Sequence, residues 1–147
     1  MADSLTAERR SWNMSRIKNK DTKIEVMVRR WLFAKGYRFR KNDNRYPGKP
    51  DVVLPKYKTV IFVNGCFWHQ HDGCKSATIP KTRTEFWVEK LNRNKEKDND
   101  NIKRLESIGW NVITLWECEL NKSFDQRMEL VDKELKHILL EDEKNEK

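Results

Sequence analysis

The chain has 147 residues, and its 31 Lys and Arg against 23 Asp and Glu give a formal net charge of +8. This length suits one compact domain, and the charge favours a polyanionic partner such as nucleic acid. The longest strongly apolar run, residues 59–63, is far below the ~20 residues of a membrane span, and residues 1–20 contain no signal-peptide core, so we expect a soluble cytoplasmic protein.

The two ends of the chain differ in charge from the middle. Residues 1–20 carry five basic and two acidic side chains, which predicts a basic arm that contacts DNA. Residues 141–147 carry four acidic and two basic side chains, and we expect this charged tail to be disordered. The predicted domain therefore spans residues 21–140.

The first predicted element is a helix that starts at Thr22. Thr22 followed three residues later by Glu25 matches a capping box, and apolar residues then recur at helical spacing. Gly36 is a plausible end of this helix.

Strands are predicted next. Residues 37–40 alternate as a short strand, residues 47–50 form a Pro-Gly turn, and residues 51–54 and 59–63 are two further strands joined closely enough for a hairpin. Residues 59–63 are nearly all β-branched or aromatic, as expected for a central strand covered on both faces, and residues 110–116 read as another buried strand.

Two more helices are predicted, over residues 85–108 and 124–140. In the helix predicted over residues 85–108, Asn94 and Asp98 interrupt the apolar stripe, because they occupy positions where the helical periodicity predicts apolar residues. The element order α-β-β-β-α-β-α predicts an α/β domain, with a mixed central β-sheet flanked by helices.

A candidate metal site follows the central strand. Cys66, Cys74 and Cys118 with one histidine make a Cys3His set, which suits structural zinc, although buried free thiols would also explain the cysteines. Spacing does not decide between His69 and His71 as the ligand. The histidine that remains would be a candidate general base.

Three acidic residues are candidates for the chemistry, each with a simpler alternative. Asp51 opens a strand and suits magnesium, but could be a turn residue bonded to its own backbone. Glu25 is accounted for by the capping box. Asp98 would need a partner or a metal if buried, unless its helix extends beyond the core.

Aromatic side chains lie among positive charges, as in proteins that insert wedges between bases. The candidates are Phe67 and Trp68 in the cysteine loop, Trp12 and Met14 in the basic arm, and Phe86 and Trp87 beside Lys81 and Arg83. We expect Phe67 and Trp68 to be exposed, while Phe86 and Trp87 could equally belong to the core.

Together these motifs resemble the very short patch repair (Vsr) endonucleases, over about residues 9–140. The motifs are Pro47-Gly48-Lys49-Pro50-Asp51, Val60-Ile61-Phe62-Val63-Asn64-Gly65-Cys66-Phe67-Trp68-His69-x-His71, Thr82-Arg83-Thr84-Glu85-Phe86-Trp87, and Gly109-Trp110 through Trp116-Glu117-Cys118. The resemblance implies a restriction-endonuclease-like PD-(D/E)XK fold. It also implies an enzyme that nicks duplex DNA 5′ of the thymine of a T:G mismatch, which initiates repair of deaminated 5-methylcytosine.

The resemblance also implies roles for the site residues. Asp51 and the backbone carbonyl of Val63 would bind catalytic Mg²⁺, and His69 would activate the attacking water. Glu25 and Asp98 would hold the hydrated metal and this water in place. The structural zinc would be bound by Cys66, His71, Cys74 and Cys118. Phe67, Trp68 and Trp87 would insert into the base stack from the major groove, and Met14 would approach from the minor groove.

This chain differs from the wider superfamily and from some relatives at the central strand. The usual (D/E)xK residues are missing from residues 59–64, and Val63-Asn64 replaces the Thr-His of some relatives. The resemblance further implies association with a cytosine-5 methyltransferase, a MutL-type partner and the nucleoid, and we expect a monomer. The alternatives are a restriction-type nickase without a mismatch requirement and a non-catalytic, zinc-stabilised DNA-binding module.

Overall fold

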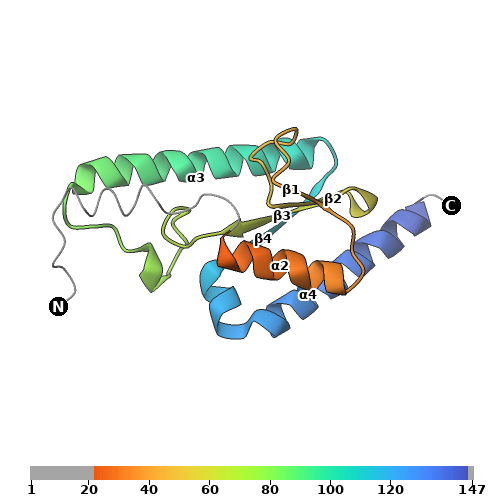
Figure 1. The fold of residues 1–147 in the computed structure, drawn as a ribbon. Coiled ribbons are helices and arrows are strands. Elements are labelled where there is room, and N and C mark those ends of the chain that lie inside the picture. Colours follow the sequence, from red (N-terminus) through yellow and green to blue (C-terminus); the bar gives the residue numbers. More distant parts are fainter. Residues whose placement is uncertain (1–21, 146–147) are drawn as a thin grey trace.

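The computed structural model describes residues 22–145, which form a sheet with helices on both faces (Figure 1). Two short 3-10 turns, η1 (Pro55–Tyr57) and η2 (Lys75–Ala77), accompany the main elements. In chain order the main elements are α2 (Lys23–Ala34), β1 (Arg40–Lys41), β2 (Val52–Leu54), β3 (Thr59–Asn64), α3 (Thr84–Ser107), β4 (Asn111–Trp116) and α4 (Glu117–Asn145). This order confirms the predicted α-β-β-β-α-β-α arrangement.

The sheet is mixed, with the strand order β1-β2-β3-β4. Strands β1, β2 and β3 pair antiparallel, and β4 pairs parallel to β3 in a register that sets Asn64 opposite Trp116. Helix α3 covers one face, and α2 and α4 lie together on the other (Figure 1). The predicted mixed sheet flanked by helices is therefore confirmed.

Strand β3 forms the centre of the core because both of its faces are covered. Ile61 and Val63 belong to a cluster with the apolar residues of α2 and α4. Val60 belongs to a second cluster that includes Leu105 of α3, and Phe62 packs against that cluster. The run of β-branched and aromatic residues in β3 is explained by this two-sided burial.

The start of α2 has the predicted capping box. The backbone N–H of Glu25 donates to Thr22 Oγ1 at 3.4 Å, and the N–H of Thr22 donates to Glu25 Oε2 at 3.3 Å. The helix ends at Ala34, and Gly36 then adopts a φ of +95°, which glycine tolerates better than other residues.

Two strand predictions need correction. The strand predicted over residues 37–40 is displaced to Arg40–Lys41, because the Tyr37 side chain is buried against α4 instead of alternating in the sheet. Strand β4 is less buried than predicted: Ile113 and Leu115 are buried, whereas Asn111 is exposed. The reason is that, within residues 22–145, β4 is an edge strand and pairs with β3 alone.

The last helix is longer than the predicted residues 124–140. Helix α4 follows β4 directly at Glu117, has non-helical backbone angles at Ser123, and continues to Asn145. It therefore includes most of the 141–147 tail that we expected to be disordered, and His137 and Glu141 form an i,i+4 ion pair at 3.8 Å near that end. The predicted arm, residues 1–20, lies outside the described residues. Within the described part of the chain, no helix has the length and apolar character needed to cross a bilayer.

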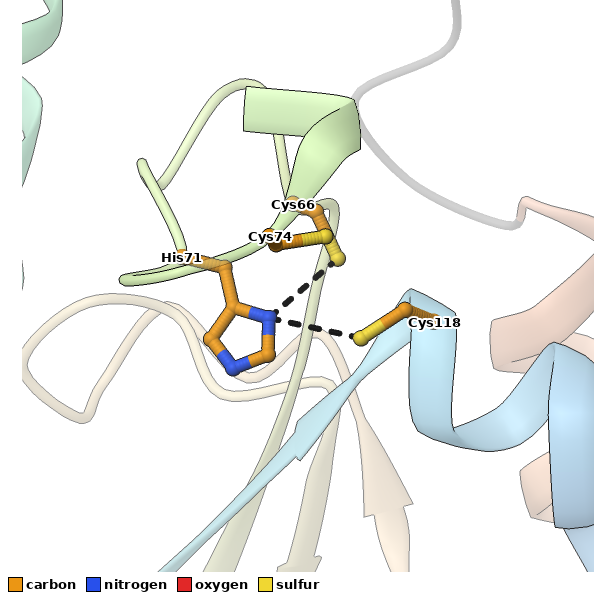
Figure 2. Close-up of side chains that lie close together, drawn as sticks. All are labelled: Cys66, His71, Cys74 and Cys118. Atoms are coloured by element: carbon orange, nitrogen blue, oxygen red, sulfur yellow. Dashed lines mark hydrogen bonds between the residues drawn. The ribbon is translucent and has the colours of Figure 1, made fainter. Parts of the chain in front are cut away.

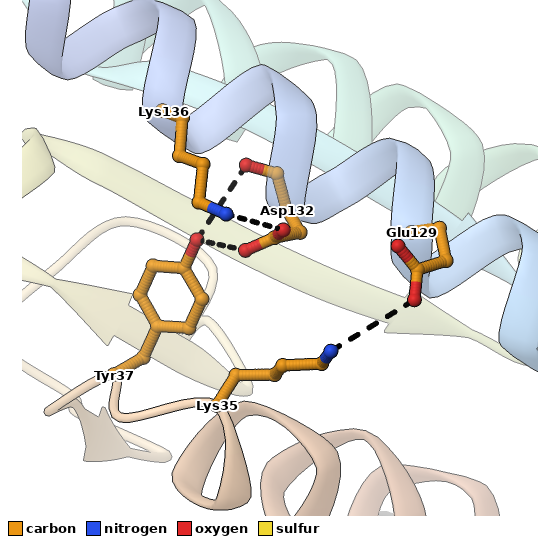
Figure 3. A network of polar contacts seen from close by, with 5 residues as sticks. All are labelled: Lys35, Tyr37, Glu129, Asp132 and Lys136. Carbon is orange, nitrogen blue, oxygen red and sulfur yellow. Dashed lines mark hydrogen bonds and ion pairs between the residues drawn. The ribbon is translucent and has the colours of Figure 1, made fainter.

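A polar network joins the segment that follows α2 to α4 (Figure 3). The Tyr37 hydroxyl donates to Asp132 Oδ1 at 2.5 Å, and Lys136 Nζ donates to Asp132 Oδ2 at 3.0 Å. Lys35 pairs with Glu129 at 3.9 Å. The hydrogen bond from Tyr37 lowers the pKa of Asp132, and burial together with this carboxylate raises the pKa of Tyr37.

We predict that Tyr37→Phe lowers the free energy of unfolding by about 1–3 kcal/mol at neutral pH, since a buried carboxylate loses its donor. The pKa of Asp132 is lowered in the folded state, so this stabilisation exists above the pKa of an unfolded aspartate. It is lost as the pH falls through the lowered pKa. Urea unfolding at neutral and acidic pH measures both effects. Tyr57→Phe, in a ring whose centroid is 5.4 Å from that of Tyr37, is the control. An equal loss at both pH values would contradict the assignment to Asp132.

Candidate functional site

The loop of residues 65–74, directly after β3, is folded tightly by its own backbone. The N–H of His69 donates to Gly65 O at 3.1 Å, and that of His71 donates to Cys66 O at 3.0 Å. Cys74 N–H then donates to His71 O at 3.2 Å. These turns place His69 and His71 at defined positions although the loop contains no regular element.

Helix α3 holds this loop through polar side chains. Asn94 Nδ2 donates to Trp68 O at 3.3 Å, and Asp98 Oδ2 lies 2.5 Å from His69 Nδ1. Asn94 and Asp98 are the two residues that interrupt the apolar stripe of α3. Their polarity is explained because they face the loop instead of the sheet.

Four metal-ligating side chains converge where β3 and β4 end (Figure 2). One ligand atom from each of Cys66, His71, Cys74 and Cys118 lies within 4.8 Å of all the others. His71 Nδ1 is 3.6 Å from Cys66 Sγ and 3.3 Å from Cys118 Sγ. Thus His71, and not His69, lies with the cysteines.

The parallel register explains this convergence. Asn64 is opposite Trp116, so Cys66 and Cys118 each follow two residues after the last paired position. Cys118 lies in the first turn of α4, directly after the strand. The Trp116 ring stacks on the His71 ring, with centroids 4.1 Å apart and planes at 8°.

These donor atoms could hold a tetrahedral metal ion. Three thiolates and one imidazole suit zinc, with donors about 2.0–2.3 Å from the ion. Burial raises the pKa of the Cys66 thiol to about 12, so without a cation this thiol would stay protonated at neutral pH and would be a poor nucleophile. The chemistry of the group therefore favours metal binding over a reactive cysteine.

Two buried carboxylates lie beside β3. Glu25 is 5% exposed and Asp51 is 9% exposed. Asp51 Oδ2 accepts a hydrogen bond from the Val63 N–H at 2.6 Å, so this carboxylate bonds the central strand and not its own turn. The structure thus describes the amide of Val63 in contact with Asp51, while a role for the Val63 carbonyl as a metal ligand stays a prediction.

The electrostatics of Asp51 show which charged groups surround it. Burial raises its pKa to about 7, the Val63 N–H opposes this shift, and the charge of Glu25 adds to it. The positive charge of Arg29, and that of His69 when it is protonated, act in the opposite direction. Glu25, Asp51 and His69 are thus brought within electrostatic reach of one another. A cation here would favour the ionised carboxylate.

His69 is held by a contact with Asp98 of α3. The contact between Asp98 and Nδ1 favours the tautomer in which Nδ1 carries the proton and Nε2 can accept one. Both side chains are 30% exposed, so neither is sealed from solvent. His69, Asp98 and Asn64 line a groove of about 440 Å³ between α3, the loop and β4.

Aromatic rings form a cluster beside this site. Centroids of Phe67 and Trp68 are 5.1 Å apart, and those of Phe67 and Trp87 are 5.6 Å apart. Lys90 Nζ lies 5.7 Å from the centroid of Trp68 and 5.8 Å from that of Trp87. The three rings are half-buried, so the expected exposure of Phe67 and Trp68 is only partial, and Trp87 is not fully part of the core. Met14 lies outside the described residues.

Three neighbours of the site were missed by sequence reasoning. Arg29 stands at the i+4 position from Glu25, and Lys90 stands at i+3 from Trp87, so helical spacing could have indicated both. The stacking of Trp116 on His71 had no such signal, because it depends on the pairing of β3 with β4.

Comparison with known proteins adds independent information. The profile of a family described as "DNA mismatch endonuclease Vsr" matches residues 2–75. The chain is 51% identical over 138 residues to "Type II nicking enzyme V.NmeAIP" of Neisseria meningitidis, covering 92% of this chain and 98% of that protein. It is 46% identical over 120 residues to "DNA mismatch endonuclease Vsr" of Escherichia coli, covering 82% and 76%. It is 41% identical over 121 residues to "Type II nicking enzyme V.XorIIP" of Xanthomonas oryzae, covering 82% and 88%.

We predict that the purified protein carries one metal ion per chain, and that His71→Gln loses it because the imidazole supplies one of four donors. His69→Gln should retain the ion, since His69 bonds Asp98 instead. His137→Gln, at an exposed position, is the control. Metal content by mass spectrometry and thermal unfolding measure the outcome. Full metal content in His71→Gln would contradict the assignment.

Proposed function

Because the chain belongs to the Vsr family of DNA mismatch endonucleases, we propose that it nicks one strand of duplex DNA 5′ of the thymine in a T:G mismatch. Such a nick would initiate very short patch repair of deaminated 5-methylcytosine. The observation that carries the proposal is the grouping of buried Glu25 and Asp51 with a histidine held by Asp98.

Asp51 is the proposed central ligand of a catalytic Mg²⁺, together with the backbone carbonyl of Val63. Oxygen donors suit this ion, and the burial of two carboxylates side by side creates a need for a cation. Bound magnesium would supply charge neutralisation to the phosphodiester. Glu25 would hold water molecules of the hydrated ion.

His69 is the proposed general base. Its Nε2 would take the proton from the attacking water, while Asp98 keeps the ring oriented and stabilises the imidazolium that forms. Asp98 would also help to hold the attacking water in place. The short contact with Nδ1 supports this division of roles.

Cys66, His71, Cys74 and Cys118 would bind one structural Zn²⁺. The ion would join the loop after β3 to the first turn of α4, which are distant in the sequence but adjacent in space. The number and softness of the donors support zinc over a hard cation. Its role would be to keep the loop that contains His69 in place.

The aromatic cluster would insert into the DNA. Phe67, Trp68 and Trp87 would enter the base stack from the major groove, and Met14 with the basic arm would approach from the minor groove. Half-buried rings beside Lys90 combine stacking surface with attraction to phosphates. A mismatch unstacks more easily than a matched pair, so insertion would contribute to selectivity.

The fold would be a variant of the restriction-endonuclease-like PD-(D/E)XK architecture. In this variant Asp51 precedes β2, the usual (D/E)xK residues are missing from residues 59–64, and Val63-Asn64 stands where some relatives have Thr-His. We further propose a monomer in the cytoplasm that works with a MutL-type protein and a cytosine-5 methyltransferase acting at the same sites.

A restriction-type nickase without a mismatch requirement is the second candidate. It is favoured by the names of relatives, since the protein with 51% identity is described as a Type II nicking enzyme. The two candidates share the catalytic residues and differ only in the DNA that they cut.

We predict that, with Mg²⁺, the protein nicks a duplex with one T:G pair on the 5′ side of the thymine. Asp51→Asn should lower the rate by about 10³-fold or more, because charge stabilisation at the phosphodiester is lost. Strand-resolved cleavage of matched and mismatched duplexes measures this, and Asp100→Asn, at an exposed ion pair, is the control. Equal cutting of matched DNA would establish the restriction-type nickase. DNA binding without any cutting would instead indicate a non-catalytic module.

We predict that Trp68→Ala weakens binding to the mismatched duplex by about 1–3 kcal/mol, the usual range for loss of one stacked base contact. Binding to matched DNA should change less, because matched pairs resist insertion. Fluorescence anisotropy with both duplexes measures the difference, and Phe33→Ala, at an aromatic residue that is 61% exposed, is the control. Equal weakening for both duplexes would count against insertion at the mismatch.

A further inference from the structure

Arg29 is a buried arginine next to the two buried carboxylates. Arg29 is 8% exposed and its Nη1 atom is buried. The next residue in the chain, Arg30, is exposed. Exposed basic side chains are suited to phosphate contacts, but a buried guanidinium is costly unless it serves the acids beside it. Arg29 therefore calls for an explanation other than contact with DNA.

The contacts of Glu25 give that explanation. Glu25 Oε2 accepts the N–H of Thr22 at 3.3 Å and forms the ion pair with Arg29 Nη1 at 3.8 Å. Neither of these contacts involves Oε1. Among the contacts between described residues, one carboxylate oxygen is thus engaged by the helix start and by Arg29, and the other is left for a ligand.

Charge balance points the same way. Glu25 and Asp51 are both buried and repel each other, and the positive charge of Arg29 acts on both. A guanidinium on the Oε2 side reduces the repulsion that would otherwise push the Glu25 carboxylate away from Asp51. The side chain of Arg29 is long enough to do this from one turn further along α2.

We propose that Arg29 is a positioning residue that holds Glu25 by Oε2, so that Oε1 is directed toward the hydrated magnesium at Asp51. The inference deepens the proposed function and rests on the same site. Arg29 would not contact the DNA or the metal itself. Its effect would pass through the orientation of Glu25.

The test is direct Mg²⁺ binding by calorimetry, together with the Mg²⁺ dependence of nicking. We expect Arg29→Gln to weaken Mg²⁺ binding by about 10-fold, as is typical when a partner of a metal-binding group is lost. Arg29→Lys should restore part of the affinity. Arg30→Gln removes the same charge one residue along the chain and should leave Mg²⁺ binding unchanged.

Two features separate positioning from other roles. Loss of a positive charge alone would strengthen cation binding, so a decrease in affinity indicates lost orientation. In a Glu25→Gln background, which retains a residue able to form the capping box, Arg29→Gln should cause no further decrease. Thermal unfolding and DNA binding without Mg²⁺ establish that each variant is folded.

Tighter or unchanged Mg²⁺ binding in Arg29→Gln would overturn the proposal, as would an equal decrease in the Glu25→Gln background. A wild-type protein that does not bind Mg²⁺ would also overturn it. If the wild type binds Mg²⁺ as expected but cuts no DNA, the proposed function fails while the role of Arg29 stands. If Arg29→Gln does not fold, Arg29→Lys provides the comparison in both backgrounds.

Discussion

The parallel pairing of β3 with β4 is the constraint on which the candidate site depends. Parallel strands end at the same edge of a sheet, so the residues that follow them meet although about fifty positions separate them in the sequence. Cys66 and Cys118 come together for this reason, and His71 is placed between them by the turns of the loop. The first turn of α4 thereby becomes part of the site.

Helix α3 makes the second connection. It crosses the sheet on the face opposite α2 and α4 (Figure 1), and its polar residues contact the loop while its apolar residues contact the sheet. His69 faces α3 and His71 faces the cysteines, so one short loop serves both groups. Any metal held at the cysteines would therefore stabilise the position of His69.

Burial of like charges gives the site its chemical character. Glu25 and Asp51 lie on the edge of the main core, where an isolated carboxylate is costly, and the pKa of Asp51 reflects that cost. The Val63 amide, Arg29 and His69 offset part of it. A cation bound here would favour the ionised carboxylates and would offset more of this cost.

Local information determined much of this protein. Four features could be predicted from the sequence because each depends on neighbours within a few residues. They are the capping box at Thr22 and Glu25, the two-sided burial of β3, the element order and the chemical character of residues 65–74. The sequence was less informative where contacts between distant residues decide the structure. Tyr37 lies outside the strand predicted for it because its hydroxyl bonds Asp132, and β4 is a half-buried edge strand. From residue spacing alone, the choice between His69 and His71 also stayed open. Only the tertiary structure set His71 beside the cysteines and His69 beside Asp98, because that choice depends on strand register and on a helix that begins ten residues after the loop ends.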